Sequence, residues 1–437
     1  MIERPAYWMA EAAGARLAAG DPAEPGPERA VVDSREAGPG DLFVGLRGEH
    51  VHGGEFAARA LEQGAWGALV GAGRGQPATD RPLLVADDPL AALQRLARAW
   101  RRELGCKAIG ITGSTGKTST KDILAALLAP HLETHANREN LNTEIGLPLS
   151  VLEARPGTEV LVLEMAMRGE GQIAELAAIA EPDVGVIVNV GPVHLELLGT
   201  VERVAAAKAE LIRDLPSGAA CVVPASEPLL DAHLRDDLDT WTFGPGGQVM
   251  LLSFDDGRAE IEARGERHRL DLGYSEPHNL LNTLAAVAAT RAIGVHTQGH
   301  VDAHFSSMRG QVVDLPGGVA VVNDCYNANP MSMRAALEHL ANSPAERRIA
   351  VLGTMAELGE EAARYHREIG ERAAELGIDL LVTVGEQALP YTDGFDGETQ
   401  AVGTPEEAGA LLEELALPGD RVLVKGSRSV GLERVLA

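Results

Sequence analysis

Short apolar runs alternate with helical stretches along the middle of the chain. Three such runs, at 108–112, 160–165 and 184–190, are each followed by residues with helical periodicity. Strands that are apolar on both faces are typical of a parallel sheet covered by helices. We therefore predict a helix-wrapped parallel sheet for this region.

The segments that flank this region have patterns of their own. The segment before it is predicted to be a small α/β unit. Its expected elements are strands at 30–35 and 42–46, a helix at 54–63 and a helix at 89–104 that stops at Gly105. Between 218 and 274, short alternating strands predict a β-rich extension, which a helix at 279–292 closes.

A third βα series begins after Gly310. Its apolar runs lie at 319–323, 348–352, 380–384 and 421–424, and helices separate them. This pattern predicts a Rossmann-like domain. The expected fold is therefore α/β with three domains, at 1–104, 105–309 and 310–437, as the length of 437 residues allows.

Composition narrows the classes of function. The net charge of −26 argues against nucleic acid as a partner, because basic residues drive that association. No uncharged apolar stretch is long enough for a membrane helix, and the first residues lack an export signal, so we expect a cytoplasmic protein without membrane insertion. A monomer is expected. The isolated cysteines Cys106, Cys221 and Cys325 are predicted to be small buried hydrophobes.

A phosphate-binding loop follows the first central strand. Residues 108–118 read AIGITGSTGKT, a strand that runs through glycines into a helix. Backbone N–H groups would face an anion there, Lys117 would reach the β- and γ-phosphates of ATP, and the Thr118 hydroxyl would bind Mg²⁺. The loop residues expected at the nucleotide are Gly113, Ser114, Thr115, Gly116, Lys117, Thr118 and Ser119. Ile111 stands at the first glycine position of the general motif, and such loops serve kinases, motors and ligases alike.

Three further residues are candidates for a metal site. Glu164 ends one predicted strand and His194 follows the end of another, at the sheet edge where α/β proteins bind ligands. Lys208 falls within the apolar stripe of a helix at 201–215, where a buried ammonium loses its proton or meets an anion. Taken singly, a solvated strand-end glutamate, a loop histidine and a lysine that reaches out to solvent are the alternatives.

The loop TGSTGKT resembles that of the Mur ligase and folylpolyglutamate synthase superfamily. The segments LEMAM, NVGPVHLE and AAAKAELI are similar, in order, to the Mur ligase pattern that holds a second magnesium ion. The resemblance implies two Mg²⁺ ions, the second bound by Glu164, His194 and an N-carboxylated Lys208. It also makes Lys117, Glu164, His194 and Lys208 the catalytic candidates.

The resemblance extends along nearly the whole chain. The stretch VDSREAGPGDLFVGLRGEHVHGGEF resembles a UDP-binding domain and implies Ser34 and Arg35 near the nucleotide sugar. Residues 138–148 resemble the Asn-rich loop of the family. The segment HNLLN resembles one near adenine and implies nucleotide contacts from Asn279 and Asn282.

The third domain resembles that of Mur ligases that add D-alanyl-D-alanine, in NDCYNANP, LGTMAELGE and KGSRSVGLERV. No DNPR element of the diaminopimelate-adding type is present. The resemblance implies nucleotide contacts from Asp324 and Tyr326 and substrate contacts from Asn327, Asn329 and Arg428. Departures from the usual residues are Thr354 for Asp, Ala166 for Gly, Gly54 for His and Val430 for Met, with the joining Gly-Arg present as Arg309-Gly310.

The expected activity is ATP-dependent ligation of D-alanyl-D-alanine to UDP-N-acetylmuramoyl-tripeptide through an acyl phosphate, in peptidoglycan precursor synthesis. The third residue of the tripeptide is either diaminopimelate or lysine. The alternatives are a related ligase with another amino donor, and a phosphate-loop kinase or nucleotide-binding protein that ligates nothing.

Overall fold

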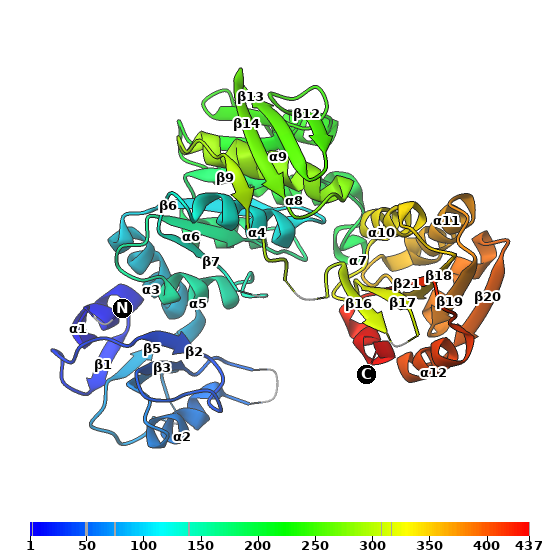
Figure 1. Ribbon diagram of the computed structural model, residues 1–437. Coiled ribbons are helices and arrows are strands. Elements are labelled where there is room, and N and C mark those ends of the chain that lie inside the picture. The colour runs from blue at the N-terminus through cyan, green and yellow to red at the C-terminus, as the bar shows by residue number, and fades with distance from the viewer. Residues whose placement is uncertain are drawn as a thin grey trace.

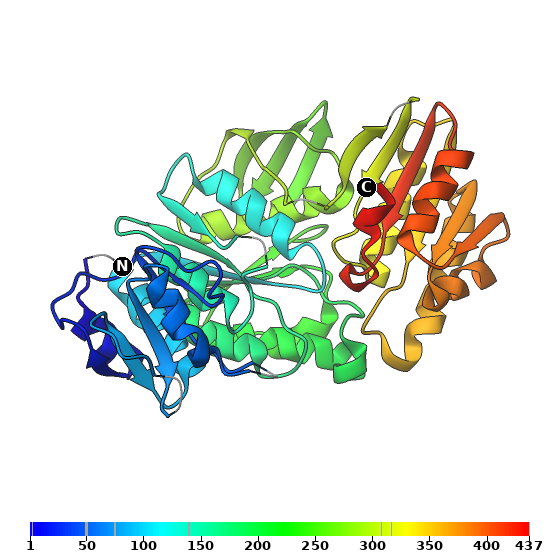
Figure 2. The same cartoon turned by 90° about the horizontal axis from the view of Figure 1, so that it is seen from below.

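The computed structural model describes residues 1, 3–48, 51–73, 76–138, 140–306, 308–315 and 317–436. Three lobes follow one another along the chain, and each has its own sheet (Figures 1 and 2). In Figure 1 the N-terminal and C-terminal lobes lie on different sides of the central lobe. The α/β class predicted from the sequence is confirmed.

The N-terminal lobe has a five-stranded sheet in the order β1-β5-β4-β3-β2, parallel except for β1. Its elements are α1 (Ala6–Ala13), β1 (Arg16–Ala19), β2 (Arg29–Val31), β3 (Asp41–Val44), a 3₁₀ turn (Gly53–Phe56), α2 (Ala57–Glu62), β4 (Gly67–Gly71) and β5 (Leu83–Ala86). The strand predicted at 30–35 was too long, because the Asp33 carboxylate accepts the Arg35 backbone N–H and turns the chain. Glu49 and His50 of the predicted UDP-binding stretch lie outside the described residues.

Helix α3 (Pro89–Leu104) joins this lobe to the next. Its bounds are those predicted, because the Asp88 side chain caps its first turn and Gly105 ends it at φ +63°. α3 contacts α1 in the N-terminal lobe and also α5 and α6 in the central one. Because α3 packs against both lobes, these contacts do not assign it to one of them. The predicted domain limits, at 104/105 and 309/310, remain predictions.

The central lobe has a ten-stranded sheet in the order β15-β14-β13-β12-β11-β10-β9-β6-β8-β7. Its first half comprises β6 (Lys107–Thr112), α4 (Lys117–Leu128), β7 (Thr134–Ala136), α5 (Gly146–Glu153), β8 (Val160–Glu164), α6 (Gln172–Ala180), β9 (Val184–Ile187), α7 (Leu195–Leu198) and α8 (Val201–Asp214). The rest comprises β10 (Ala220–Pro224), β11 (Asp239–Phe243), β12 (Val249–Asp255), β13 (Arg258–Ala263), β14 (Glu266–Leu272), α9 (Pro277–Ala292) and β15 (Gly299–Val301). The predicted β-rich extension thus continues the parallel sheet through β10 and β11.

The C-terminal lobe has a six-stranded sheet in the order β16-β17-β21-β18-β19-β20. Its elements are β16 (Gln311–Leu315), β17 (Val319–Asn323), α10 (Pro330–Asn342), β18 (Arg347–Gly353), α11 (Ala362–Glu375), β19 (Leu380–Val384), β20 (Glu398–Val402), α12 (Pro405–Leu415) and β21 (Asp420–Lys425). The sequence missed the two edge strands, β16 and β20, because most of their residues are exposed and neither is an apolar run.

Each predicted strand of the central and C-terminal lobes contributes side chains to a buried core. Cys106, Cys221 and Cys325 are buried and free, as predicted. Among the described residues, no helix has the length and apolarity needed to cross a bilayer.

The packing of α11 gives a stability prediction. A methyl group at Gly370 would overlap the Tyr391 carbonyl oxygen, in the 3₁₀ segment Glu386–Gly394. Gly370→Ala should lower the free energy of unfolding by about 1–3 kcal/mol, because overpacking outweighs the better helix propensity of alanine. Urea unfolding measures this. Gly169→Ala, where no atom lies within 4 Å of the added methyl, is the control and should change little. An undiminished midpoint for Gly370→Ala would contradict this packing.

Candidate functional site

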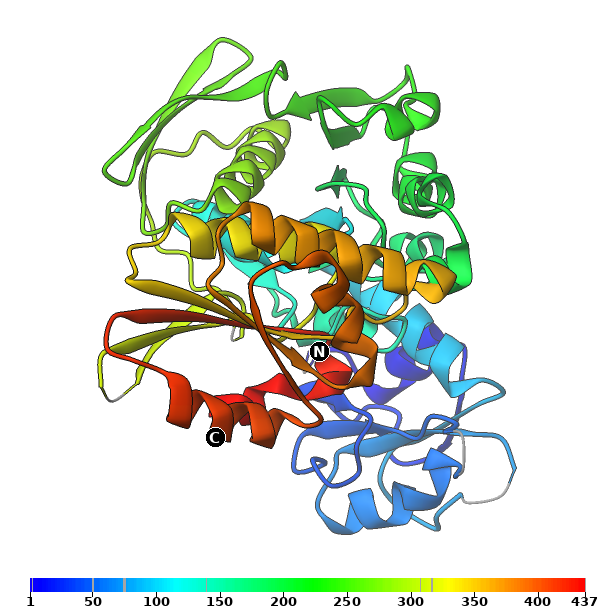
Figure 3. The same cartoon turned by 90° about the vertical axis from the view of Figure 1, so that its right-hand side faces the viewer.

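A cleft of about 1240 Å³ lies between the central and C-terminal lobes. Figure 3 views the molecule from the C-terminal lobe, with the central lobe behind it. On the central side, the residues that follow β6, β8 and β9 line the cleft; on the other side, those that follow β17 and β21 do so. Two carboxyl-end sheet edges therefore face one space, the usual position for a ligand of α/β domains.

The phosphate loop lies at the end of β6 and begins α4. The Asn189 side chain holds this loop, since its Oδ1 accepts N–H groups from Ser114 and Thr115 at 3.1 and 3.0 Å. Lys117 donates to the Gly113 carbonyl at 2.9 Å, so its ammonium lies back over the loop. Among the described residues, no side chain caps the first turn of α4, which leaves its N–H groups for an anion.

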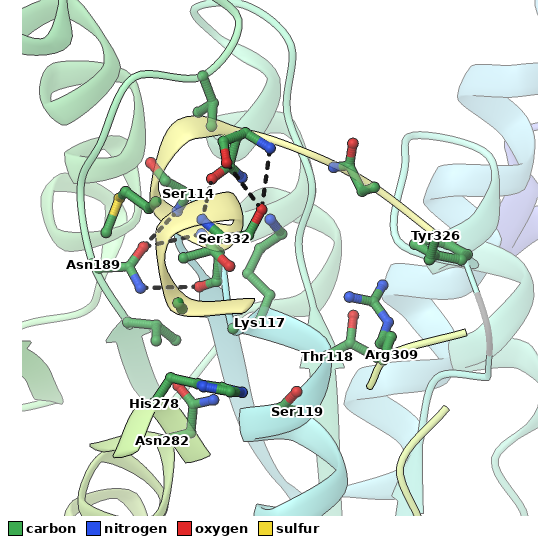
Figure 4. Close-up of a pocket in the computed structure, with 18 of the residues that line it drawn as sticks. Ser114, Lys117, Thr118, Ser119, Asn189, His278, Asn282, Arg309, Tyr326 and Ser332 are labelled. Carbon is green, nitrogen blue, oxygen red and sulfur yellow. Dashed lines mark hydrogen bonds between the residues drawn. The ribbon is translucent and has the colours of Figure 1, made fainter. Parts of the chain in front are cut away.

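Gly116 joins this loop to α9. It has φ +76°, and an added Cβ would lie 2.6 Å from Asn282 Oδ1. Both the backbone and the space therefore require glycine. Figure 4 shows the start of α4 with His278 and Asn282 on one side and Arg309 and Tyr326 on the other. Asn279, predicted at the nucleotide with Asn282, lines the same cleft.

Glu164 is the buried carboxylate of the cleft. Its Oε2 accepts the Thr118 hydroxyl at 2.7 Å, and its Oε1 accepts the Asn142 amide at 2.9 Å. Asn137 fixes its backbone on both sides. The carboxylate thus faces the phosphate loop, and the oxygen donors of Thr118 and Glu164 suit Mg²⁺.

Lys208 is almost fully buried, at 1% exposure, as its place in the apolar stripe of α8 predicted. Within the described part of the chain, no hydrogen bond or ion pair reaches its ammonium. Burial, and then repulsion by Lys117, lowers its pKa well below the usual value. A neutral amine is the form that reacts with CO₂, so the residue fits the carbamate that the resemblance implies.

His194 reaches across to the C-terminal lobe. Its backbone has φ +54°, and its Nδ1 lies within hydrogen-bonding distance of the Glu357 carboxylate. This contact lowers the pKa of Glu357. Because Nδ1 is engaged, Nε2 is the nitrogen that His194 can offer to a metal in the cleft it lines.

Buried charges also line the C-terminal side. Lys425, 2% exposed, donates to Asp324 Oδ2 at 2.6 Å and to the Asn327 carbonyl at 2.9 Å. The Arg309 guanidinium lies over the Tyr326 ring, 4.2 Å from its centroid.

The remaining predicted substrate residues of this lobe differ in whether other residues already engage their side chains. Asn327 and Arg428 line the cleft, and Arg428 forms an ion pair with Glu433 at 2.9 Å. Asn329 lines it too, but its side-chain oxygen caps α10 by accepting the Ser332 N–H. A capping role therefore accounts for Asn329 locally.

Ser34 and Arg35 lie apart from this cleft, in the loop after β2. Ser34 is buried, whereas Arg35 is exposed and donates to the Asp33 carboxylate. That contact lowers the pKa of Asp33 to about 2. The predicted sugar site and the phosphate loop thus belong to different lobes.

Among the lining residues that sequence reasoning did not assign to the site are Asn189, Arg309, Glu357 and Lys425. Two carried a readable signal. Asn189 follows an apolar strand as Glu164 does, and Lys425 is one of five lysines and ends an apolar strand. Of the predicted Asn-rich loop, Asn140, Asn142, Thr143 and Glu144 line the cleft, while Glu139 lies outside the described residues.

Comparison with protein families matches three models to successive parts of the chain. The Mur ligase family catalytic domain matches residues 30–101, the Mur ligase middle domain 111–290, and the Mur ligase glutamate ligase domain 308–428.

Relatives match over nearly the full length. The UDP-N-acetylmuramoyl-tripeptide–D-alanyl-D-alanine ligase of Synechocystis sp. is 36% identical over 93% of this chain and 90% of its own. That of Bacillus subtilis is 33% identical over 97% of this chain and 96% of its own.

Solved structures agree in fold. A crystal structure of MurF from Acinetobacter baumannii has a TM-score of 0.84 at 29% identity and covers 93% of this chain and 92% of that one. MurF from Thermotoga maritima in complex with ADP has a TM-score of 0.81 at 34% identity, with 93% and 96% covered. Three family models in order, relatives above 30% identity and the shared fold lead to one conclusion: the chain belongs to the Mur ligase family.

Proposed function

We propose that this protein is an ATP-dependent ligase that joins D-alanyl-D-alanine to UDP-N-acetylmuramoyl-tripeptide, giving the pentapeptide, ADP and phosphate. The observation that carries the proposal is the cleft in which the phosphate loop and Glu164 face the C-terminal segment 324–329. The printed names of the relatives from Synechocystis and Bacillus subtilis support this pair of substrates.

The nucleotide site uses the start of α4. The free N–H groups of Gly116 to Ser119 and the helix dipole favour the phosphates, and Lys117 turns from Gly113 to the γ-phosphate. The ADP complex of the Thermotoga relative supports ATP as the energy source. We assign the rest of the nucleotide to Asn282, which lies beside Gly116, and to Asn279, which accepts from the Asn282 amide. Asp324 and Tyr326 of the C-terminal lobe are assigned to the same ligand.

Thr118 and Glu164 would hold one Mg²⁺, and Glu164, His194 and carboxylated Lys208 a second. When bound, these ions neutralise charge on the phosphates. The donors suit the ions, since the Glu164 carboxylate already accepts from the Thr118 hydroxyl and carboxylation would turn the unpaired, buried amine of Lys208 into an anion.

The reaction has two displacements. The terminal carboxylate of the tripeptide attacks the γ-phosphorus, which forms an acyl phosphate and releases ADP. The amine of D-alanyl-D-alanine then attacks the acyl carbon, loses a proton and expels phosphate. Lys117 neutralises the transferred group, and Asn327 and Arg428 are the candidates for contacts to the incoming dipeptide.

The acyl phosphate must be kept from water. The C-terminal lobe covers the cleft and contacts the central lobe through Glu357 and His194. The UDP-sugar is assigned to Ser34 and Arg35 of the N-terminal lobe, so the substrate would span two lobes. We place the reaction in the cytoplasm, where ATP is available, and assign it to a monomer.

Release of ADP tests the proposal against its alternatives. Turnover should require UDP-N-acetylmuramoyl-tripeptide and D-alanyl-D-alanine together. Dependence on another amino acid in place of the dipeptide would favour the related ligases. Release that ignores the amine would favour a kinase or an ATPase. Running the assay with diaminopimelate-ended and lysine-ended tripeptides identifies the third residue.

Lys117→Ala should reduce turnover by roughly 100-fold or more, because it removes the cation that neutralises the transferred phosphoryl group. Binding of the UDP-tripeptide, measured by calorimetry without ATP, should remain, since the UDP site lies in another lobe. Lys107→Ala is the matched control, because Lys107 is exposed and pairs with Asp183 away from the cleft. Equal losses of turnover and UDP-tripeptide binding in folded Lys117→Ala would refute separate sites.

Lys208→Ala should remain folded and bind ATP but lose at least roughly 100-fold in turnover, because a ligand of the second Mg²⁺ is gone. Acetate at high concentration should restore part of the rate by supplying a carboxylate in the vacated space. Lys208→Met keeps the volume and apolar stem of the side chain, so this variant should fold. Acetate should not restore its rate, because methionine fills the space that acetate would occupy. Near-normal turnover of either variant, or electron density for an unmodified amine in a crystal of the magnesium-loaded enzyme, would defeat the carbamate assignment.

A further inference from the structure

A cluster of two imidazoles and a carboxylate lies in the β-rich part of the central lobe, away from the cleft. Glu266 and His268 point to one face of β14, since they are two residues apart on a strand. His296 comes from the turn between α9 and β15, the strand that pairs with β14. One possible ligand atom from each lies within 4.8 Å of the other two. Figure 1 places β13, β14 and α9 on the side of the central lobe opposite the N-terminal lobe.

His268 carries an unused nitrogen into this cluster. The side chain is fully buried, and its Nδ1 lies 3.0 Å from the Thr297 carbonyl oxygen. A carbonyl only accepts, so Nδ1 bears the proton and Nε2 holds a lone pair. That Nε2 is buried and has no hydrogen-bond partner among the described residues.

A buried acceptor without a partner costs free energy, and a neutral imidazole held by a carbonyl is the arrangement found in metal-binding histidines. The ring of His296 packs against it, with centroids 4.2 Å apart. The unpaired nitrogen is therefore buried in the same cluster as a second imidazole.

The other two side chains already lie at ligand spacing. His296 Nδ1 is 3.3 Å from Glu266 Oε2, and two ligands of one tetrahedral zinc ion are about 3.3 Å apart. Arg291 donates to the other oxygen, Oε1, at 2.7 Å and so leaves Oε2 for a cation. Gln298 Nε2 lies 2.8 Å from His296 Nε2, so the amide donates there and His296 Nδ1 carries its proton toward Glu266. When a cation replaces that proton on Nδ1, a half-turn of the carboxamide brings its oxygen to accept from Nε2.

We propose that Glu266, His268 and His296 form a site for a borderline divalent cation, of which Zn²⁺ is the prototype. A ligand set in which two of three donors are imidazole nitrogens suits Zn²⁺ better than Mg²⁺, which binds mainly through oxygen donors. Water would complete the tetrahedron. Thr297, Gln298 and Arg291 then orient the three ligands.

The site has a structural consequence. It ties β14 to the chain that leaves α9, and the other end of α9 carries Asn279 and Asn282 beside the phosphate loop. The cation would thus hold the C-terminal end of a helix whose N-terminal end faces the nucleotide. Its effect is on stability, because the site lies outside the cleft and touches no group of the ligation.

Zinc titration of the full-length protein tests the site. After chelator treatment, ZnCl₂ is titrated against a chromophoric chelator in excess MgCl₂, and thermal unfolding is followed with and without zinc. His296→Ala and Glu266→Gln remove ligands that are partly exposed, so neither should compromise folding. His304→Ala is the matched control, because His304 is exposed and outside the cluster.

Wild type and His304→Ala should bind one more zinc equivalent than the two ligand variants, or bind it at least about tenfold more tightly. Zinc should also raise the unfolding temperature of wild type and His304→Ala, but not that of the two ligand variants. Zinc bound in the cleft by Glu164 and His194 would be common to all four proteins and cancels in this comparison. Equal zinc stoichiometry and affinity in the four proteins would overturn the proposal. So would a loss of zinc binding in His304→Ala as large as the loss in His296→Ala and Glu266→Gln.

Discussion

The cost of burying charge is the constraint on which the proposed chemistry depends. Lys117 and Glu164 line the cleft, whereas the fully buried Lys208 is not among the lining residues but lies close enough to Lys117 for that ammonium to lower its pKa. Burying a charged amine is costly, so Lys208 favours the neutral form, which is the form that CO₂ modifies. The charge of Lys117 needs an anion, and we propose that the phosphates of ATP supply it. The cost of burying charge thus underlies both the proposed phosphate site and the proposed carbamate.

The central and C-terminal lobes each contribute one wall of the cleft. The central lobe presents the N–H groups that we propose bind phosphate, while the C-terminal lobe brings Asp324, Lys425 and Glu357 to the opposite wall. An acyl phosphate lasts only where water is kept out, and two facing walls achieve this better than one open edge. The contact between Glu357 and His194 joins the walls next to a proposed metal ligand.

Local signals in the sequence predicted much of the fold. Short stretches of sequence predicted the apolar strands, the ends of α3 at Asp88 and Gly105, and the inward-facing Lys208. Each is found as predicted. Exposed edge strands such as β20 have no such pattern. The site was predictable where a residue follows its own strand, as Glu164 does. Glu357 and Arg309 were missed because their role depends on how two lobes face each other, which no local pattern encodes.

The central claim is that the tripeptide carboxylate attacks ATP and is activated as an acyl phosphate. Oxygen-18 in the terminal carboxylate of UDP-N-acetylmuramoyl-tripeptide tests it most directly. The account predicts that one labelled oxygen per turnover appears in the released phosphate, because the carboxylate oxygen that attacks phosphorus leaves with it. Phosphate free of label, with pentapeptide formed and ATP consumed, would contradict the account.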